Sequence, residues 1–554
     1  MLKLLYIISV NHILYCNCMF IENPCFEKET IHTPVIHQCL KECLQGYHDA
    51  HYILDGFKQG FSLGLQQEPS LQPYTKIMPA KPALKEKLLD EVKKGRIIGP
   101  FDAAPVKDLM TSPICVIPKS DGKKYRMIFN LSHPKGQSVN DNIPDDQTAV
   151  TYCSVTDVAR WIVRQQGVWF MAKADLSDAY RMVPIRKSDW KYLGMRLGES
   201  FFIDRCLPMG AASSCAIFQR ISNALAWITM STAPVYCTVF NYLDDFLFLA
   251  RSRTECEISL KTFIDLCNRI GVPISSNKTV PPNTSLIFLG VGINSIKREL
   301  FIPPEKARSV LEELKKFLSK RTQRVKKWQS ILGKLCHLSQ VVSSGRAYLS
   351  SVYSSLKGIL SQHGNRFRTI SAEAREDLEV WGKFLEQIPP TRHFRMLTSS
   401  TPTMIIYTDA SQTVGYGAVW GQEWLAGEWP QNWKTLNIAI LETFPILAAL
   451  LTWEEKAENG TILIHTDNKA VVSVVNKLYS KDRGLRQLVK PLALHCLLKN
   501  IKLQATHIEG VNNIGPDMLS RGKIKEFLAR FQHMKSTPAA MPNKILPKNL
   551  RFPA

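Results

Sequence analysis

Acidic residues are scarce in this chain of 554 residues: 48 Asp and Glu stand against 70 Lys and Arg, so the formal net charge is +22. A positive excess of this size attracts polyanions, and nucleic acid is the first partner to consider. The plainer alternative is a basic soluble protein that has no such partner. Charge alone therefore favours nucleic-acid binding but does not assign it.

Regular cysteine spacing and long apolar runs are also missing. The 14 cysteines form no paired, metal-spaced set, so we expect reduced intracellular thiols and no zinc site. Residues 1–20 are apolar, but Asn11 and His12 interrupt them and no small-residue cleavage site follows, which disfavours a secretory signal. No later run is apolar enough to span a membrane. We therefore expect an intracellular protein of the cytoplasm, the nucleus or both, without a membrane partner.

The stretch FNYLDDFLFLA places two adjacent carboxylates, Asp244 and Asp245, between apolar runs that are typical of β-strands. A third acid, Asp175, ends the apolar strand predicted over 168–174. Carboxylates gathered on one sheet surface repel each other unless divalent cations neutralise them, and Mg²⁺ prefers oxygen ligands. The pattern predicts a hairpin tip beside Asp175 and a two-metal site suited to phosphoryl transfer.

Six motifs, in one fixed order over residues 85–300, resemble reverse transcriptases. The fingers motif is VIPKSDGKKYRMIFNLSHPKGQSVND; the palm motifs are ADLSDAYRMVPI, LPMGAASSCAIFQ and YLDD; SSNKTV and FLGVGI follow. The resemblance implies a right-hand polymerase with fingers, palm and thumb.

In this resemblance Asp175, Asp244 and Asp245 are the catalytic acids, and they hold two Mg²⁺ ions, with Mn²⁺ as an alternative. Tyr180 matches the ring that excludes a ribose 2′-hydroxyl, which implies DNA synthesis rather than RNA synthesis. The other positions implied to bind the dNTP are Lys119, Arg126, Asp178, Ala179 and Lys278.

Several of these positions also have a plainer interpretation. Lys278 matches a lysine that protonates pyrophosphate, but a surface lysine after a turn is the alternative. Tyr180 taken alone is more typical of a core aromatic. The chain also departs from the family pattern, because Met209 stands where Phe or Gln is frequent and Cys215 where Pro is common. These departures leave nucleotide affinity and fidelity open.

Four further acids follow a change of pattern after the predicted linker at 399–403. Asp409 ends a strand, Glu442 lies on an apolar helix, Asp467 ends another strand, and Asp517 begins a short helix. For any one of them a helix cap or a solvated turn is the plainer interpretation. Together, in this order, they resemble RNase H, which implies an α/β domain that binds Mg²⁺ and hydrolyses the RNA strand of an RNA–DNA hybrid.

Some features of this second segment differ from cellular RNase H. His507 and Asn513 match the short form found in retroelement enzymes, and Pro445 predicts a kink that shifts the Glu442 carboxylate. FNLSHPKGQSVNDNIP, HIEGVNNIGPDMLSR and the SDW at 188–190 most resemble DIRS-type (tyrosine-recombinase) retrotransposons. LTR retrotransposons and plant pararetroviruses share the same domain order. The resemblance implies a recombinase or integrase and a Gag-like protein on other chains.

Helical and strand patterns predict the remaining organisation. Periodicity predicts a helix over 81–100 that stops at Gly99-Pro100, a helix closed by Gly271, and a strand over 285–293. Residues 304–400 are predicted to be mostly helical, with a basic cluster beside Trp328 that is either a solvated face or a track for phosphates. The cluster contains Lys315, Lys316, Lys320, Arg321, Arg324, Lys326 and Lys327.

The predicted fold is multidomain, α/β and α+β: a right-hand polymerase, then a helical tether, then an RNase H-like α/β domain. The predicted function is a retrotransposon RNA-directed DNA polymerase with RNase H activity, whose partners are an RNA template, a DNA primer, the RNA–DNA hybrid and dNTPs. The alternatives are a catalytically inactive nucleic-acid-binding relic and an RNA-templated RNA polymerase. The predicted domains are 1–80, a poorly defined N-terminal extension; 81–300, fingers and palm; 301–400, thumb and connection; 401–522, RNase H-like; and 523–554, a basic tail.

Overall fold

The structure is a computed structural model, and part of the chain is described in it. No helix of the described ranges is long and apolar enough to cross a lipid bilayer. The described ranges are 29–66, 71–74, 76, 81–118, 125–358, 364–386, 391–394, 401–458, 460–543 and 546–547.

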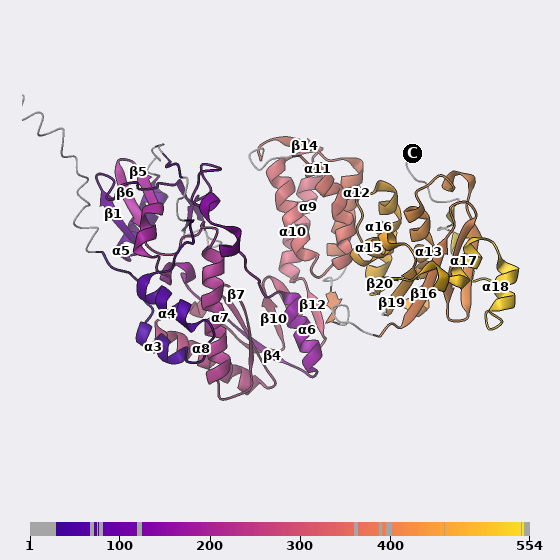
Figure 1. Cartoon of the computed structure of the whole chain (residues 1–554), viewed down its shortest axis with the longest axis horizontal. Helices are drawn as coiled ribbons and strands as arrows, with labels where there is room; N and C mark the ends of the chain where they lie inside the picture. The colour runs from indigo at the N-terminus through magenta and orange to yellow at the C-terminus, as the bar shows by residue number, and fades with distance from the viewer. Residues whose placement is uncertain are drawn as a thin grey trace, which may run out of the picture. The chain divides into compact units, whose positions relative to one another are not determined.

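The chain divides into two compact units, Met1–Ser154 with Val168–Thr284, and Val155–Gly167 with Ser285–Ala554. Each unit contains both helices and β-sheets, which confirms the predicted multidomain class of α/β and α+β type (Figure 1). The division into two units does not test the borders of the five predicted domains, which remain predictions.

The centre of the first unit is a four-stranded antiparallel sheet in the order β7-β8-β4-β9. Aromatic and aliphatic side chains fill these strands, and β8 is buried at every position after its first residue. Helices α7 (Ser214–Thr232) and α8 (Arg253–Ile270) pack on this sheet. The strands are β4 (Phe170–Asp175), β7 (Thr238–Tyr242), β8 (Asp245–Ala250) and β9 (Val280–Asn283).

Local sequence explains why α8 begins and ends where it does. Ser252 and Glu255 form a reciprocal capping box at its start, and Gly271 closes it in the left-handed conformation, as predicted. Phe263 of α8 packs on Phe246 of β8 with ring centroids 4.6 Å apart. The helix therefore supports the strand whose first residue is one of the candidate acids.

A three-stranded sheet, β1-β6-β5, and a hairpin, β2-β3, follow helix α5 (Pro82–Lys93). The helix predicted over 81–100 is wrong at its C-terminal end, because it stops at Lys93 and Gly99-Pro100 lies within β1. A Cβ at Gly99 would lie 2.7 Å from the carbonyl oxygen of Phe201, so pairing with β6 requires glycine there. The strands are β1 (Ile97–Phe101), β2 (Ile114–Pro118), β3 (Tyr125–Phe129), β5 (Gly194–Leu197) and β6 (Ser200–Asp204).

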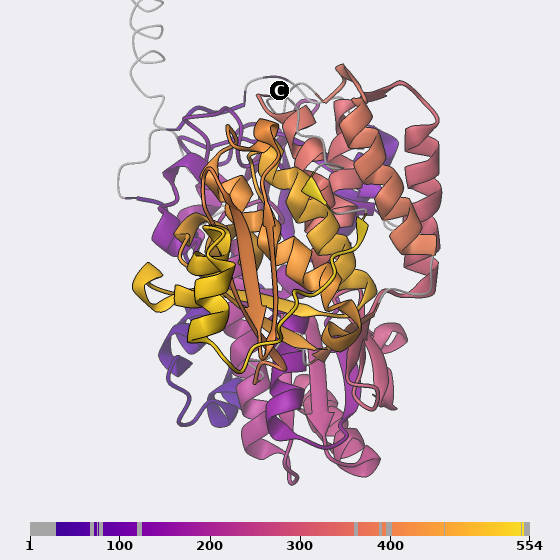
Figure 2. The same ribbon diagram turned by 90° about the vertical axis from the view of Figure 1, so that its right-hand side faces the viewer.

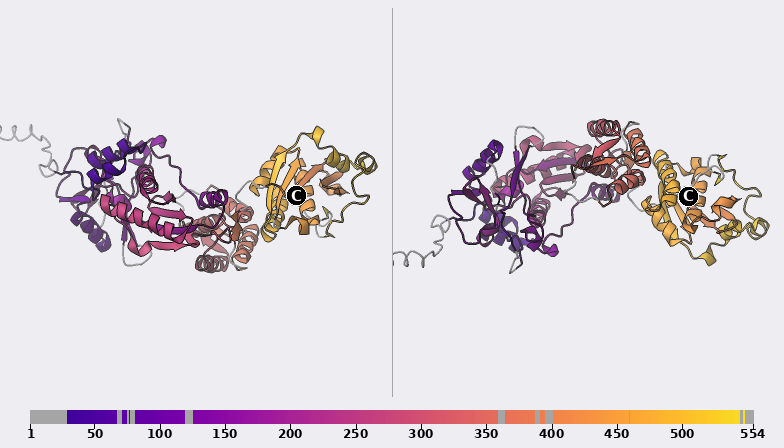
Figure 3. Two further views of the ribbon diagram at one scale, coloured as in Figure 1. Left: turned by 90° about the horizontal axis from the view of Figure 1, so that it is seen from below. Right: turned by 90° about the horizontal axis from the view of Figure 1, so that it is seen from above.

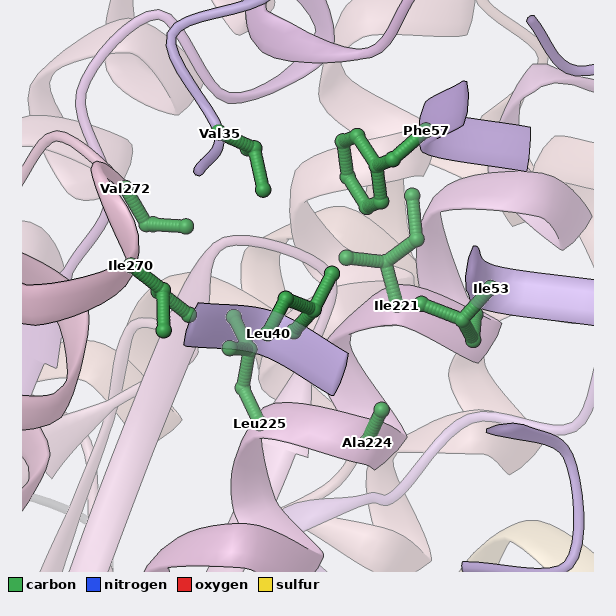
Figure 4. A pocket seen from close by; sticks show the side chains of 9 residues that line it. All are labelled: Val35, Leu40, Ile53, Phe57, Ile221, Ala224, Leu225, Ile270 and Val272. Carbon is green, nitrogen blue, oxygen red and sulfur yellow. The ribbon is translucent and has the colours of Figure 1, made fainter. Parts of the chain in front are cut away.

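Part of the predicted N-terminal extension belongs to the core of the first unit. Helices α3 (His37–Cys43) and α4 (Ala50–Gln59) were not predicted, yet they pack against α8 and α7. Arg220 of α7 donates to both carboxylate oxygens of Asp49, at 2.7 and 2.5 Å. Apolar side chains from these helices face one small cavity between them (Figure 4). A chain that began at residue 81 would expose this apolar surface.

The second unit contains helices α9 (Pro304–Leu318), α10 (Val325–Leu338), α11 (Ser350–Leu356) and α12 (Ala372–Glu386). The described part of 304–400 is therefore mostly helical, as predicted. A sheet in the order β10-β11-β12-β15 accompanies them, with α6 packed beside β11. The bounds are α6 (Val155–Gln165), β10 (Ser285–Phe288), β11 (Val291–Asn294), β12 (Glu299–Phe301) and β15 (Thr391–His393).

The single strand predicted over 285–293 is wrong, because β10 and β11 form a hairpin with a two-residue turn. Leu289 and Gly290 both adopt positive φ, 48° and 73°, which is the backbone that a tight hairpin turn needs. Lys306 Nζ donates to the Gly290 carbonyl at 2.9 Å and to His337 Nδ1 at 3.2 Å. His337 Nε2 in turn donates to the Leu289 carbonyl at 3.1 Å. This arrangement needs a neutral imidazole, since Nδ1 accepts a hydrogen bond.

The pKa of His337 makes this turn sensitive to acid. Burial and the charge of Lys306 hold the pKa of His337 below its usual range. We expect the melting temperature to fall as the pH drops below about 6.5, because the unfolded chain then binds a proton that folded His337 resists. His337→Gln should weaken this dependence in melting curves at pH 7.5 and 5.5. If the melting temperatures of wild type and His337→Gln depended equally on pH, His337 would not be the source of the acid sensitivity.

The C-terminal part of the second unit is a five-stranded mixed sheet in the order β18-β17-β16-β19-β20 (Figure 2). Strands β16, β17 and β18 are antiparallel neighbours, whereas β19 runs parallel to β16 and β20 parallel to β19. The carboxyl ends of β16, β19 and β20 therefore meet at one edge. The strands are β16 (Met404–Ala410), β17 (Gly415–Trp420), β18 (Glu423–Glu428), β19 (Thr461–Thr466) and β20 (Lys502–His507).

Helices cover both faces of this sheet (Figure 3). Neighbouring residues of a strand face opposite sides, and Ala418 packs in the core with α13, whereas Val419 packs with Leu519 of α17. Each face of the sheet thus has its own apolar core. The helices are α13 (Ile438–Thr452), α14 (Glu454–Ala457), α15 (Lys469–Lys477), α16 (Arg483–Leu498), α17 (Ile514–Ser520) and α18 (Ile524–Arg530).

Candidate active sites

The first acidic site lies where β4 and the β7–β8 hairpin end side by side. Asp175 is the last residue of β4 and pairs with Asp245, the first residue of β8, while Asp244 occupies the hairpin turn. Leu243 adopts a left-handed conformation in this turn, and its N–H donates to the side chain of Gln219 at 2.9 Å. The predicted hairpin tip is confirmed, and it brings the three acids to one edge of the sheet.

Two lysines pair with two of the three acids of this site. Lys278 Nζ lies 2.8 Å from Asp175 Oδ1, and Lys173 Nζ lies 2.6 Å from Asp245 Oδ1. Burial raises the pKa of the Asp244 carboxyl, and the charges of Asp175 and Asp245 raise it further. Asp175 is only 5% exposed, and a carboxylate at that depth needs a cation beside it. The Lys278 ammonium group supplies that cation for Asp175, and these three acids are not among the described acids whose carboxylate oxygens gather within 4.8 Å of one another.

Two of the candidate nucleotide positions, Ala179 and Tyr180, lie on the 3₁₀ helix η3 (Ala179–Met182), and Asp178 directly precedes it. The Tyr180 ring stacks on Phe218 of α7 at 5.0 Å and 16°, and its hydroxyl donates to Cys215 Sγ at 3.4 Å. Burial raises the pKa of the Tyr180 hydroxyl, so it stays protonated at neutral pH. Ala179 is buried beside it. Cys215, a departure from the family pattern, therefore fixes the tyrosine ring.

Ion pairs hold η3 in place. The sequence pattern did not indicate these pairs. Arg181 is buried and donates to Glu91 at 3.0 Å and to Asp204 at 2.8 Å. Burial lowers the pKa of Arg181, but the two carboxylates outweigh burial and raise it above its usual value. Arg96 donates to Asp178 at 2.9 Å. The partners of Arg181 lie 90 and 23 residues away in the chain, so only the folded structure reveals this network.

The other predicted nucleotide contacts belong to the fingers segment. Arg126 is exposed on β3, opposite Ile117 of β2, whereas Lys119 lies outside the described residues. The turn that contains Met209 packs on the end of the same hairpin. A Cβ at Gly210 would lie 1.9 Å from the Phe129 carbonyl oxygen, so this turn requires glycine.

The second acidic site lies at the edge where the parallel strands of the five-stranded sheet end. Asp409 is near the end of β16, Asp467 follows β19, and Glu442 comes from α13. One carboxylate oxygen of each lies within 4.8 Å of the other two. Helix α13 runs without interruption through Pro445, and the predicted shift of Glu442 away from the site is not seen.

The electrostatics of this triad are those of a cation site. Burial raises the pKa of Glu442 to about 9, and the charges of Asp409 and Asp467 contribute. Burial and neighbouring carboxylates raise the pKa of Asp409 to about 6. Glu442 Oε2 is buried and has no hydrogen-bond partner in the described part of the chain. Three mutually repelling carboxylates and an unpaired buried oxygen fit a divalent cation.

Asp517, the fourth predicted acid, lies on α17 beside this triad. Its charge raises the pKa of Asp409, but its oxygens are not within the compact group. Arg521 donates to Asp517 Oδ1 at 2.7 Å, and Ser520 donates to Asp409 Oδ2 at 2.5 Å. The sequence reasoning missed both Ser520 and Arg521, which follow Asp517 in the segment PDMLSR.

His507 and Asn513 act on the main chain of the strands that carry the acids. His507 Nε2 bonds the carbonyl oxygen of Asp467 at 3.0 Å. Asn513 Nδ2 donates to the carbonyl oxygen of Thr408 at 2.9 Å, one residue before Asp409. Both side chains therefore hold the edge of the sheet in place and do not touch the carboxylates through these bonds.

Retroelement and viral polyproteins are similar to this chain. It is 23% identical over 367 residues to the putative enzymatic polyprotein of Cassava vein mosaic virus, covering 64% of this chain and 52% of that protein. It is 23% identical over 476 residues to the Transposon Tf2-3 polyprotein of Schizosaccharomyces pombe, covering 83% of this chain and 32% of that protein. The chain thus spans about half of the first relative and about a third of the second.

Among solved structures, the foamy viral protease-reverse transcriptase resembles the chain. Its complex with double-stranded DNA gives a TM-score of 0.48 at 17% identity, over 87% of this chain and 83% of that chain. Its complex with an RNA/DNA hybrid gives a TM-score of 0.47 at 16% identity, over 87% of this chain and 64% of that chain.

The family model described as "Reverse transcriptase (RNA-dependent DNA polymerase)" matches residues 117–293. This range contains Asp175, Asp244 and Asp245, whereas the second acidic triad lies beyond it. Residues 117–293 therefore form a reverse transcriptase domain of the kind found in retroelement polyproteins.

Proposed function

We propose that this chain copies RNA into DNA and cleaves the RNA strand of the resulting hybrid, as the RNA-directed DNA polymerase and RNase H of a retrotransposon. The observation that carries the proposal is a pair of separate acidic sites, one inside the reverse transcriptase match and one on a different sheet. We assign the element to the DIRS-type group only on its FNLSHPKGQSVNDNIP and HIEGVNNIGPDMLSR segments and the SDW at 188–190.

In the polymerase site, Asp175 and Asp244 are the proposed metal ligands. Two Mg²⁺ ions held there would supply activation of the primer 3′-hydroxyl and neutralisation of charge on the departing pyrophosphate. Asp245 is the third proposed acid, and its pairing with Lys173 balances its charge. Lys278 is 58% exposed, so its side chain can leave Asp175 and turn toward a triphosphate. Lys119 and Arg126 are the proposed triphosphate contacts from the fingers.

Tyr180 is the proposed selector of deoxyribose. The ring cannot move aside easily, because Phe218 stacks on it and Cys215 accepts a hydrogen bond from its hydroxyl. We expect Tyr180→Ala to raise ribonucleotide incorporation relative to deoxyribonucleotide incorporation by about tenfold or more, since a steric clash of a few kcal/mol is removed. The measurement is kcat/KM for a dNTP and the matching NTP, with Tyr180→Phe as the control that keeps the ring. Wild-type preference for NTPs would instead favour an RNA-templated RNA polymerase.

In the nuclease site, Asp409, Glu442 and Asp467 are the proposed ligands of the metal, and Asp517 completes the set of acids. Metal held there would supply an activated water for hydrolysis of a phosphodiester. Ser520 positions Asp409 through its hydrogen bond, and His507 positions the main chain at Asp467. The proposed substrate is the RNA strand of an RNA–DNA hybrid.

Primer extension tests the polymerase part of this proposal. The full chain is incubated with an RNA template, a DNA primer, Mg²⁺ and dNTPs, and product length is read on a gel. We expect extension to the template end and none when EDTA replaces Mg²⁺. A folded chain that binds the primer–template but never extends it would instead favour the inactive relic.

A further inference from the structure

One exposed end of the helical bundle in the second unit carries a strongly basic surface. The link between α9 and α10 contains a short strand, β13 (Thr322–Arg324), which pairs with β14 (Phe367–Thr369) at this end of the bundle (Figure 1). Residues 320–327 and 364–370, which contain and flank these strands, are named here the β13–β14 tip. Neither active site includes any of these residues.

The β13–β14 tip carries cations and no acids. Its two segments, KRTQRVKK and GNRFRTI, contain no Asp or Glu. Each of its basic side chains is exposed, and none makes a salt bridge with a described carboxylate, whereas nearby Lys315 pairs with Glu386. Unpaired cations at this density repel each other, and a polyanion relieves that repulsion. The seven cations are Lys320, Arg321, Arg324, Lys326, Lys327, Arg366 and Arg368.

An exposed aromatic ring lies among these cations. Trp328, which neighbours the cluster in sequence, is fully buried against Phe317 and cannot contact a ligand. Phe367 instead is 60% exposed, and the Arg324 guanidinium group lies 5.5 Å from its ring centroid. Arg324 and Phe367 are directly opposite each other across the two strands, so they share one face. A ring with adjacent cations is the combination that binds unpaired bases.

The tip is held in place by main-chain hydrogen bonds. The N–H of Val325 donates to the Arg366 carbonyl at 2.8 Å, and the N–H of Ile370 donates to the Arg321 carbonyl at 2.9 Å. Arg375 of α12 donates to two main-chain carbonyls at the end of α9, at 2.8 and 3.3 Å. Two segments that are distant in sequence are thereby fixed as one surface.

We propose that the β13–β14 tip binds single-stranded nucleic acid, with its cations on successive phosphates and Phe367 stacked on one base. Seven cations without an acid fit a polyanion, and the exposed ring favours a strand whose base faces are free over a duplex, in which they are covered. The site goes beyond the proposed function, since it needs neither acidic centre to be catalytic.

Binding of the full chain to a fluorescent 12-nucleotide oligo(dT) tests this site by anisotropy. Phe367→Ala should weaken binding by about 5- to 100-fold, the range of one lost base–aromatic stack, and Phe367→Tyr should restore it. Tyr236→Ala, at a 64% exposed aromatic of the first unit, is the matched control and should leave binding unchanged. Equal affinity of wild type and Phe367→Ala would overturn the proposal.

The salt dependence of the same binding tests the cations. Arg366→Gln combined with Arg368→Gln should reduce the slope of log K against log salt by about 1.4, since each phosphate contact on a single strand contributes about 0.7. Lys58→Gln combined with Lys261→Gln, at exposed lysines of α4 and α8, is the matched control and should not change the slope. The same double variant is also tested on a blunt duplex. If it weakened duplex binding by the same factor as oligo(dT) binding, the tip would be a duplex site and the proposal would fail.

Photo-crosslinking locates the bound strand without relying on a variant. The oligonucleotide carries one 5-iodouracil, and crosslinked peptides are identified by mass spectrometry after irradiation. We expect a crosslink to Phe367 or to its neighbours within 364–370. Crosslinks confined to other parts of the chain would overturn the proposal. Because the readout is physical attachment, failure of the catalytic proposal would not affect it.

Discussion

Asp244→Asn should reduce DNA synthesis by about a thousandfold or more and leave hybrid cleavage within about twofold of wild type. The substitution removes one of the two carboxylates proposed to hold metal, and a loss of about 4 kcal/mol of transition-state stabilisation corresponds to that factor. The measurement is the rate of primer extension beside the rate of cleavage of a preformed hybrid, each at saturating Mg²⁺.

The surroundings of Asp244 make this variant informative. Burial raises the pKa of Asp244 and the charges of Asp175 and Asp245 raise it further, so a neutral amide is easier to bury, removes repulsion and should not unfold the hairpin. Asp265→Asn, at an exposed site of α8, is the control for a lost surface charge. Asp245→Asn should also lower stability, because it leaves the mostly buried Lys173 ammonium group unpaired. Loss of both activities in a folded Asp244→Asn chain would contradict two independent sites.

Asp467→Asn should have the opposite effect, with hybrid cleavage reduced by about a thousandfold or more and DNA synthesis unchanged. Asp467 is part of the compact triad with Asp409 and Glu442, and an amide in its place removes a charged ligand. Rates of cleavage of an RNA-labelled hybrid and of primer extension by the same preparation give the comparison.

A graded comparison within the second site sharpens that test. Asp517 lies outside the compact triad and pairs with Arg521, so Asp517→Asn should reduce cleavage less than Asp467→Asn does. Mg²⁺ should raise the melting temperature of wild type, because a bound cation offsets both the burial and the repulsion by Asp409 and Asp467 that together raise the pKa of Glu442 to about 9. The rise in melting temperature that Mg²⁺ causes should be smaller in Asp467→Asn than in wild type. An Asp517→Asn loss equal to that of Asp467→Asn would contradict this account of the site.

Sequence reasoning found the acids because Asp175, Asp409 and Asp467 follow apolar strand patterns, Glu442 lies on an apolar helix, and the ordered motifs around all seven acids resemble known families. It named Lys278 as a nucleotide contact, but it did not predict that Lys278 pairs with Asp175 or that Lys173 pairs with Asp245. Lys173 lies two residues before Asp175, and strand periodicity alone places both on one face. Arg181 could not be paired with Glu91 from sequence, because that contact depends on packing of segments 90 residues apart.

The remaining errors have local physical causes. The segment 285–293 is rich in apolar residues typical of strands, but Leu289 and Gly290 adopt positive φ and turn it into a hairpin. Helices α3 and α4 were missed because their stability comes from packing on α7 and α8 rather than from a strong local pattern. The sequence did not indicate that Phe367 lies beside Arg324, because the strand pairing that brings them together joins two distant segments.

One measurement tests the central claim most directly, that one chain holds a DNA polymerase site and a separate hybrid-cleaving site. The full chain is given a DNA primer on a 5′-labelled RNA template with Mg²⁺ and dNTPs, and primer extension and RNA fragments are followed in the same tube. The account predicts extension followed by shortening of the RNA, with Asp244→Asn cleaving a preformed hybrid and Asp467→Asn extending without cleavage. A folded wild-type chain that retains the hybrid but neither extends nor cleaves it would contradict the account and favour an inactive nucleic-acid-binding relic.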